Sequence, residues 1–600
     1  MEFPAHASST KDIEDIVEKW KRDIPDHKRL IINDIIHELV LNITSNLDTN
    51  RKFLNTLIAR HGRGSFAKAD LNFQYRELVT SGKLNLDKNV LNTLTKKVGR
   101  SDSGVVSITV STSPGKFSCP QNCHYCPNEP GMPRSYVSTG PSILRAARVD
   151  FDVVRQFKDR ALCLASMGHE ITKIEIIVLG GTWSYHLVDY QEQFISGIYY
   201  AANTLIDEVN RPIKTLEEEI KINETATARI IGLTLETRPD HINEAEITRF
   251  RKYGVTRVQL GVQHLDDKIL EYINRRCPTY RTYDAIRLLK ENGFKTDLHF
   301  MPDLPGSSYE QDLEMFQTLF SKDNELIQGD QLKIYPCMTT QHTEILKWYK
   351  DGSYKPYHDM DDGKLLFDLI VYITTHVPRW IRLNRVVRDI PSTVIEAGIK
   401  ETNLYQRVLK HMSDHSLKGN DIRFREIKLM EVNSKDCAIF IDTYRSSGGL
   451  EYFISYETKD REKLIGFLRL RINDNPEAPY FKELKGATLV RELHVYGKLV
   501  HQNRRFSLSH QHQGIGKMLL AKAEDISKNM HKYTKIAIIS GIGVREYYRK
   551  RGYVLEGSYM TKNIKSSYMI LRHKPWIIAA TGLISMIIAG RYIHNRFIKK

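Results

Sequence analysis

The chain has 600 residues, of which 41% are hydrophobic and 27% charged, so it is globular rather than disordered and too long for a single core. Its seven cysteines are odd in number and unevenly spaced, which argues against the disulfide framework of a secreted protein and favours a reducing compartment. A formal net charge of +16 makes nucleic acid a candidate partner.

Residues 1–100 are predicted to be a helical region with a basic surface. The segment 31–47 has helical hydrophobic periodicity. Recurrent lysines and arginines with Phe66, Phe73 and Tyr75 among them are suited to a phosphate backbone and unstacked bases. An ordinary helical bundle with a basic face fits the same pattern, so both interpretations stay open.

Residues 101–340 alternate between strand and helix patterns, which predicts a parallel sheet. Six such units would form a partial (β/α)6 barrel, and functional groups are then expected at the carboxyl ends of its strands. The candidate strands are 105–111, 173–179, 230–235, 257–262, 296–301 and 331–335.

The loop after the first of these strands carries Cys119, Cys123 and Cys126, with no fourth cysteine nearby. Fully ligated iron–sulfur clusters usually take four cysteines, and structural zinc takes four ligands. Three cysteines therefore predict a 4Fe–4S cluster with one iron open to a substrate or cofactor. A zinc site completed by His124 is the alternative, although this residue lies inside the loop and would need strained geometry. The spacing resembles that of the radical S-adenosylmethionine (SAM) enzymes, in which SAM occupies the open iron.

Four further sequences also close predicted strands, and each of them contains glycine or proline. Any one of them fits ordinary turn chemistry. Together with the cysteine loop they make five marked segments at the same edge of one barrel, which favours a functional site. They are 180–182, 236–240, 261–263 and 301–306.

Residues 341–430 are predicted to bridge two domains, with a strongly basic segment at Arg379–Arg388. From residue 431 the pattern changes to antiparallel strands, which predicts an α+β domain of ordinary size up to residue 572. The expected strands are 438–443, 450–456, 464–471, 488–496, 535–540 and 553–559, with helices from about 514 and at 544–550.

A glycine-rich turn at Gly514 and Gly516 leads into the first helix of this domain. Such a turn lets backbone N–H groups approach a pyrophosphate at a helix N-terminus. The order of strand, turn, helix, strand and tyrosine-containing helix resembles the GNAT acetyltransferases, which bind acetyl-CoA. Tyr547 and Tyr548 fit half-buried aromatic residues, or a phenol that protonates the thioester sulfur.

A radical-SAM barrel followed by a GNAT domain resembles the family of the catalytic subunit of Elongator, a tRNA uridine-modifying enzyme. The resemblance covers about residues 30–572, and the chain is identified as a member of the family by several long motifs. These are 236–240, 301–305, 388–391, 491–497 and 511–514.

The resemblance also implies roles for individual residues. The three cysteines are expected to ligate the cluster, and Tyr547, Tyr548 and Glu236 are the expected catalytic residues. The SAM pocket is expected to include Gly180, Gly181, Glu236, Arg238 and Gln263. Acetyl-CoA is expected to contact Lys173 from the barrel, and Glu492, Leu493, His494, Val495, Gln513, Gly514, Ile515, Gly516 and Tyr547 in the GNAT domain.

By the same resemblance, a SAM-derived radical removes a hydrogen from the acetyl methyl group of acetyl-CoA, and the carbon radical adds to carbon 5 of the wobble uridine. Hydrolysis then leaves 5-carboxymethyluridine. The expected partners are tRNA, bound by residues 1–100 with help from 379–388, and Elongator-type accessory subunits or a second copy. A histone or tubulin lysine acetyltransferase with a structural cluster domain is the main alternative, and an inactive tRNA-binding scaffold is another.

The C-terminal segment 576–590 is apolar throughout and flanked by basic residues. Fifteen helical residues span roughly 22 Å against a hydrocarbon core of ~30 Å, and extension to 593 makes a marginal span possible. We expect a tail anchor at 576–593, with a buried terminal helix as the alternative. This tail, and a cysteine spacing shorter than that of many eukaryotic relatives, favour a divergent member. Its catalytic body is expected in the cytosol on the mitochondrial outer membrane, or alternatively on the endoplasmic reticulum.

Overall fold

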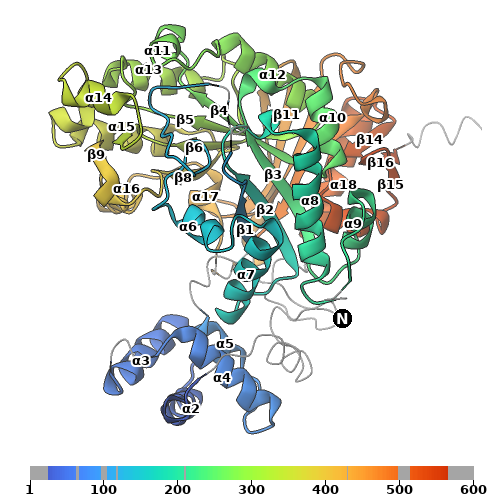
Figure 1. Ribbon diagram of the computed structural model, residues 1–600. Helices are drawn as coiled ribbons and strands as arrows, with labels where there is room; N and C mark the ends of the chain where they lie inside the picture. Colours follow the sequence, from blue (N-terminus) through green and yellow to red (C-terminus); the bar gives the residue numbers. More distant parts are fainter. Residues whose placement is uncertain are drawn as a thin grey trace, which may run out of the picture.

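The computed structural model describes residues 24–62, 66–95, 104–115, 119, 121–207, 211–428, 430, 432–496 and 514–564. A helical unit, a parallel half-barrel and a second sheet follow one another along the chain (Figure 1). The second sheet, coloured orange and red, lies against the green barrel, and the blue helical unit lies beside α7.

The N-terminal helices pack around a hydrophobic core of their own, which includes Ile32, Leu54, Leu71 and Val90. The side chains of Asn46 and Asp87 accept hydrogen bonds from backbone N–H groups at the starts of two helices. These N–H groups have no carbonyl partner within the helix. The helical character expected here is confirmed within the described residues. The helices are α2 (Asp26–Leu41), α3 (Leu47–Arg60), α4 (Lys68–Thr80) and α5 (Lys88–Leu94).

The first sheet is a half-barrel whose strands all run parallel. Helices between successive strands cover its outer face, as a parallel sheet requires (Figure 1). In sheet order the strands are β1 (Val106–Ser111), β2 (Lys173–Leu179), β3 (Arg229–Thr237), β4 (Arg257–Gln263), β5 (Lys295–Phe300), β6 (Gln331–Ile334) and β8 (Arg382–Val386). The covering helices include α7 (Val153–Ser166), α8 (Val188–Asn203), α9 (Leu216–Asn223), α10 (Glu244–Lys252), α12 (Thr279–Glu291) and α13 (Tyr309–Phe320).

The barrel has seven strands within the described residues, not the six predicted, because the basic segment assigned to the bridge supplies β8. Its sequence hides a buried parallel strand because Arg382 and Asn384 line an internal cavity, while Leu383 packs into the core. Periodicity alone could not separate an arginine-rich strand from a solvated loop. Between β6 and the second domain the chain also forms a small pair of strands, β7 (Met338–Thr340) and β9 (Ile395–Gly398), with helices α14 (Ile345–Lys350), α15 (Lys364–His376), α16 (Leu404–Asp414) and α17 (Ile422–Arg425).

The second sheet is antiparallel except where β13 and β14 run side by side in parallel. Helix α18 (Ile515–Asp525) packs on its middle strands. The strand predicted at 553–559 is instead two strands, which turn at Gly557. In sheet order the strands are β10 (Cys437–Arg445), β11 (Gly449–Thr458), β12 (Leu464–Asn473), β13 (Thr488–Val495), β14 (Lys535–Ile538), β16 (Tyr559–Asn563) and β15 (Val554–Glu556).

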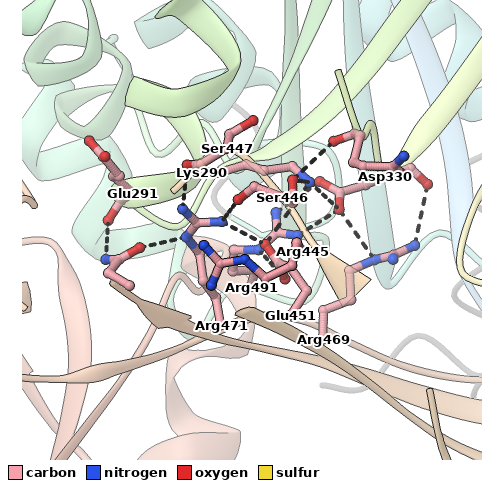
Figure 2. Close-up of polar contacts among 12 residues, drawn as sticks. Lys290, Glu291, Asp330, Arg445, Ser446, Ser447, Glu451, Arg469, Arg471 and Arg491 are labelled. Atoms are coloured by element: carbon pink, nitrogen blue, oxygen red, sulfur yellow. Dashed lines mark hydrogen bonds and ion pairs between the residues drawn. The ribbon is translucent and has the colours of Figure 1, made fainter. Parts of the chain in front are cut away.

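A buried network of charges joins the two sheets (Figure 2). Asp330, which precedes β6, pairs with Arg491 of β13 at 2.6 Å, and Arg491 also meets Glu451 of β11 at 3.0 Å. Lys290 of α12 lies 3.7 Å from Asp330, and Arg471 of β12 lies 3.1 Å from Glu451. None of these five side chains is exposed to solvent, so the two sheets share a charged core.

Gly541 lets the second domain approach the barrel closely. A Cβ atom at this position would lie 1.9 Å from the carbonyl oxygen of Ile231 in β3. We expect Gly541→Ala to force the two backbones apart and to lower the free energy of unfolding by about 1–3 kcal/mol, as overpacking does. Thermal unfolding of the variant measures this change. Gly115→Ala is the matched control, because a Cβ there meets nothing within 4 Å, and an equal effect of the two changes would contradict the prediction.

Among the described residues, no helix combines the length and the apolar character that a membrane span requires. The tail anchor predicted at 576–593 lies outside the described residues.

Candidate active site

One large cavity, of about 2880 Å³, is shared by the half-barrel and the second sheet. Cys119 and Cys126 line it at the carboxyl edge of the barrel strands, and Gly516 and Tyr547 line it in the second domain. Lys295, at the amino end of β5, meets Glu492 of β13 at 3.5 Å. The cavity therefore reaches from the carboxyl edge of the barrel to its amino edge, where the second domain covers it.

All three cysteines of the loop line this cavity. Thr182 donates a hydrogen bond to Cys119 Sγ at 3.4 Å. Burial and the neighbouring Cys123 raise the pKa of the Cys126 thiol to about 11. Thiols in such surroundings stay protonated until a metal displaces the proton, which couples metal binding to proton release.

Two arginines stand next to the middle cysteine. Guanidinium nitrogens of Arg238 and Arg275 each lie 3.9 Å from Cys123 Sγ. Their positive charge suits the thiolate-rich, negatively charged surroundings of an iron–sulfur cluster. The thiols and both guanidinium groups thus fit the predicted cluster. Arg275 was missed by the sequence argument, because no local motif marks it.

The structure does not place His124 as the fourth ligand of the alternative zinc site. The ring of His124 packs edge-on against Trp348, with ring centres 4.9 Å apart, and it is not among the cavity-lining residues. Within the described part of the chain, no three His, Cys, Asp or Glu side chains are grouped as a single metal ion would need. A 4Fe–4S cluster binds each cysteine at a different iron, so its ligands stand further apart.

The glycines predicted for the SAM pocket have different surroundings. Gly181 lines the cavity, with φ +94°. Gly180 is not among the cavity-lining residues and packs against Thr112, the residue after β1, where a Cβ atom would lie 1.8 Å from Thr112 Oγ1. Gln263, with φ +77°, and Arg238 both line the cavity. Gly180 therefore permits a close backbone approach, and the other three are placed to contact a ligand.

Glu236 lies in the cavity wall and is held by Tyr136 on the loop after the cysteines. The Tyr136 hydroxyl donates to Glu236 Oε2 at 3.2 Å. Burial raises the pKa of Glu236, although Lys333 and Arg388 act against this. The carboxyl group is consequently easier to protonate than an exposed glutamate. Tyr136 is a second residue that the sequence argument missed.

The acetyl-CoA end of the cavity is built on a gap between two parallel strands. β13 pairs with β14 only from Thr488 to Val490, and beyond this point the strands diverge. Glu492, Leu493, His494 and Val495, all predicted contacts, follow the divergence and line the cavity. None of these four residues is in register with β14.

The electrostatics of this end are set by Glu492 and His494. Burial would raise the pKa of Glu492, but Lys295 and Arg469 outweigh it and hold the value at about 2. Burial lowers the pKa of His494, whose Nε2 has no hydrogen-bond partner. An ionised carboxylate and a neutral imidazole therefore lie side by side on β13.

The glycine-rich turn stands at the start of α18. Gly514 caps the helix with φ +77°, and a Cβ atom at Gly516 would lie 2.6 Å from the hydroxyl oxygen of Tyr547. The helix N-terminus and the Tyr547 phenol thus meet at one point of the cavity. The side chain of Ile515 is buried in the core and is not among the cavity-lining residues, so its predicted contact with acetyl-CoA would have to come from its backbone. Gln513 lies outside the described residues.

The two predicted tyrosines occupy different surroundings on α19 (Arg545–Arg549). The ring of Tyr547 lies under the Arg551 guanidinium at 3.4 Å, and burial raises the pKa of its phenol. Tyr548 is 6% exposed and packs on Tyr553, and it also lines the cavity. A phenol with a raised pKa stays protonated at neutral pH, so Tyr547 can donate a proton.

Lys173 begins β2 at the amino edge of the barrel and lines the same cavity. Burial lowers the pKa of its ammonium group, although Glu170 acts against this. The structure therefore places this barrel lysine in the cavity that also holds the glycine turn, and its contact with acetyl-CoA stays a prediction.

The cysteine loop and the predicted acetyl-CoA end open into one cavity. This arrangement is typical of an enzyme class in which radical chemistry is coupled to acyl transfer. Comparisons with known families agree. Residues 117–319 match the Radical SAM superfamily, 329–414 the Radical_SAM C-terminal domain, and 423–553 the Acetyltransferase (GNAT) family.

Whole-chain relatives narrow the class further. A tRNA uridine(34) acetyltransferase of Methanocaldococcus jannaschii is 40% identical, over 79% of this chain and 87% of its own. The Elongator complex protein 3 of Drosophila melanogaster is 33% identical, over 90% of this chain and 97% of its own length. The structure of the Methanocaldococcus infernus Elp3 with an N-terminal deletion matches with 37% identity and a TM-score of 0.66, covering 77% of this chain and 99% of that one. The chain belongs to the family of Elongator complex protein 3 and the archaeal tRNA uridine(34) acetyltransferases.

Proposed function

We propose that the chain is a tRNA uridine(34) acetyltransferase that builds a carboxymethyl group on carbon 5 of the wobble uridine. The observation that carries this proposal is the single cavity that joins the cysteine loop to the glycine turn of α18. Two separate activities would not need a shared interior. A reaction that takes a fragment of acetyl-CoA to a radical site does need one.

Different residues along the cavity bind the cluster and SAM. Cys119, Cys123 and Cys126 hold the 4Fe–4S cluster, which when bound supplies the electron for cleavage of SAM. Gly181, Arg238 and Gln263 bind SAM, with Glu236 beside them. The protein's own part is to position the reactants and to exclude water from the radical.

The second domain binds acetyl-CoA and releases CoA. The diverging strand β13 and the N-terminus of α18 hold the pantetheine and pyrophosphate groups. The Tyr547 phenol, next to Gly516, donates a proton to the departing thiolate. The basic N-terminal helices and the segment 379–388 bind tRNA, and Elongator-type subunits or a second copy are further partners.

Anaerobic reconstitution tests this function directly. The protein is purified with iron and sulfide and incubated with SAM, a reductant, acetyl-CoA and a tRNA transcript, and the nucleosides are analysed by mass spectrometry. We expect 5-carboxymethyluridine that depends on both SAM and acetyl-CoA. Acetylation of histone or tubulin peptides without SAM, with the tRNA unchanged, would establish the lysine acetyltransferase instead.

Tyr547→Phe is expected to reduce acetyl-CoA turnover by about 10²–10⁴-fold, the usual contribution of a general acid. Tyr480→Phe is the control and is expected to change turnover little, since Tyr480 is 44% exposed in the second domain and is not among the cavity-lining residues. CoA release is followed with a thiol reagent. Equal losses in the two variants would contradict the role of Tyr547.

We propose further that this member of the family is divergent and tail-anchored through residues 576–593, with the mitochondrial outer membrane favoured over the endoplasmic reticulum. The apolar sequence and its basic flanks support the proposal. A fluorescent protein fused ahead of residues 565–600 should label mitochondria and resist alkaline extraction. A diffuse signal that alkali extracts would contradict the anchor.

A further inference from the structure

The interior of the half-barrel holds a polar cluster, and most of its residues have no role in the function proposed above. Glu236, Gln259, His299 and Lys333 project from four neighbouring strands, β3 to β6, and all line the cavity. Glu236 is in register with Gln259, and His299 with Lys333. At the level of His299, β4 carries Gly261, and the side chains of Gln263 and Arg275 lie next to this glycine. These residues lie deeper along the strands than Gln263, which is paired with Phe300.

Two groups of the cluster are buried without a hydrogen-bond partner. Gln259 is fully buried and His299 is 5% exposed, yet the Nε2 atoms of both are unpaired. Lys333 Nζ donates to Gln259 Oε1 at 2.7 Å, which fixes the amide so that its N–H groups remain free. A buried polar group left unpaired destabilises the protein, and a ligand that pairs with it removes this penalty.

The imidazole of His299 is poised to accept a hydrogen bond. Its Nδ1 faces Glu236 Oε1 at 3.9 Å, which favours the proton on Nδ1 and a lone pair on Nε2. Burial, with Lys333 and Arg388 nearby, keeps its pKa well below the ordinary range, so the ring is neutral. The cluster therefore presents an amide donor, an ammonium donor and an imidazole acceptor.

We propose that Gln259, His299 and Lys333 form a base-reading pocket that binds the imide edge of a flipped-out uracil. Uracil presents a carbonyl oxygen, an N3–H donor and a second carbonyl oxygen, which complement two donors and one acceptor. Cytosine presents an amine and an N3 acceptor on the same edge and would leave these groups unpaired. Enzymes that modify a base read its Watson–Crick edge in this way. The inference rests on the proposed function, and it adds the residues that select uridine.

The expected size of this selection follows from the burial of the pocket. A site built to hydrogen-bond a substrate group rejects an analogue that lacks it by about 10⁴–10⁵-fold, because the groups of the site are left unpaired. The phosphate backbone, by contrast, supplies most of the affinity for tRNA without reading sequence. Loss of the pocket is therefore expected to reduce base selection while tRNA affinity stays nearly unchanged.

Gln259→Leu, which keeps the shape of the side chain and removes the donor, tests the pocket. Wild type and variant are compared for tRNA affinity, for SAM cleavage and for modification of transcripts that carry U34 or C34. We expect the variant to bind tRNA within about 2-fold of wild type and to cleave SAM normally. Its kcat/KM on U34 should fall by about 10–100-fold, the loss expected from one to two unsatisfied hydrogen bonds. Gln317→Leu, at an exposed position of α13, is the control for an added leucine.

A second variant keeps the test decisive if Gln259→Leu does not fold. Lys333→Met removes the ammonium donor from a half-buried side chain, with the exposed Lys322→Met as its control. In addition, ligand-observed NMR of the purified protein with uridine and cytidine monophosphates reports binding without catalysis. We expect wild type to prefer the uridine nucleotide and Lys333→Met to lose that preference.

The outcomes separate the inference from the function on which it rests. Unchanged modification of U34 by both variants, or loss of SAM cleavage together with product, would overturn the uracil pocket while wild type still modified tRNA. Absence of product with wild type on any tRNA would overturn the proposed function and the pocket with it.

Discussion

Asp330→Asn is expected to lower the free energy of unfolding by about 3–5 kcal/mol, because breaking a buried ion pair leaves its partner charge uncompensated. Asp330 faces Arg491 at 2.6 Å, Lys290 at 3.7 Å and Arg469 at 3.8 Å, all of them buried. The variant therefore removes the negative charge that faces these three buried positive charges. Chemical unfolding at neutral pH measures the change.

The matched control is Asp474→Asn. Asp474 pairs with Arg445 on the surface of the second domain, and both side chains are 46% exposed. Solvent-exposed pairs contribute only about 0–1 kcal/mol, so this variant should be nearly neutral. A loss for Asp330→Asn no larger than that for Asp474→Asn would contradict a stabilising role of the network.

The network also predicts a pH dependence. Burial would raise the pKa of Asp330, but Arg491 and Lys290 outweigh it and hold the pKa well below its usual range. A carboxylate with a depressed folded-state pKa contributes its stability above the unfolded pKa and loses it as the pH falls through the folded pKa. Wild type should accordingly lose this stability on acidification, and Asp330→Asn should show a smaller loss over the same interval.

Cys123→Ala is expected to reduce bound iron to background and the yield of modified tRNA by about 100-fold or more, beyond what loss of an outer-shell partner causes. Cys123 is the buried middle thiol, next to Arg238 and Arg275. Iron content, the charge-transfer absorption of the cluster and nucleoside mass spectrometry measure the result. Acetyl-CoA binding by the second domain should be retained, which separates loss of the cluster from unfolding.

The control for this change is Cys163→Ala. Cys163 lies on α7 and is not among the cavity-lining residues, and its thiol accepts a hydrogen bond from Arg160 at 3.8 Å. We expect full iron content and product. A variant at Cys123 that still yielded modified tRNA would exclude the radical mechanism for this chain.

The sequence by itself determined the parts of this protein that rest on local patterns. Alternating strand and helix signals predicted the parallel barrel, because each βα unit has its own periodicity. The cysteine loop and the turn at Gly514 were visible because cluster ligation and pyrophosphate binding need short, fixed spacings. The meeting of Glu236, Gln263 and the cysteines in one cavity followed from a general rule, that parallel strands end at one edge.

Tertiary structure alone decided the features that depend on residues distant in the chain. β8 is a strand because Arg382 and Asn384 face a polar interior, which no local pattern reveals. Asp330 and Arg491 form a buried pair across 161 positions. Gln259 and His299 look like ordinary strand residues until their unpaired nitrogens are seen inside the barrel. The physical reason is the same in each case: burial and charge pairing belong to the folded surroundings of a side chain, whereas spacing belongs to the chain itself.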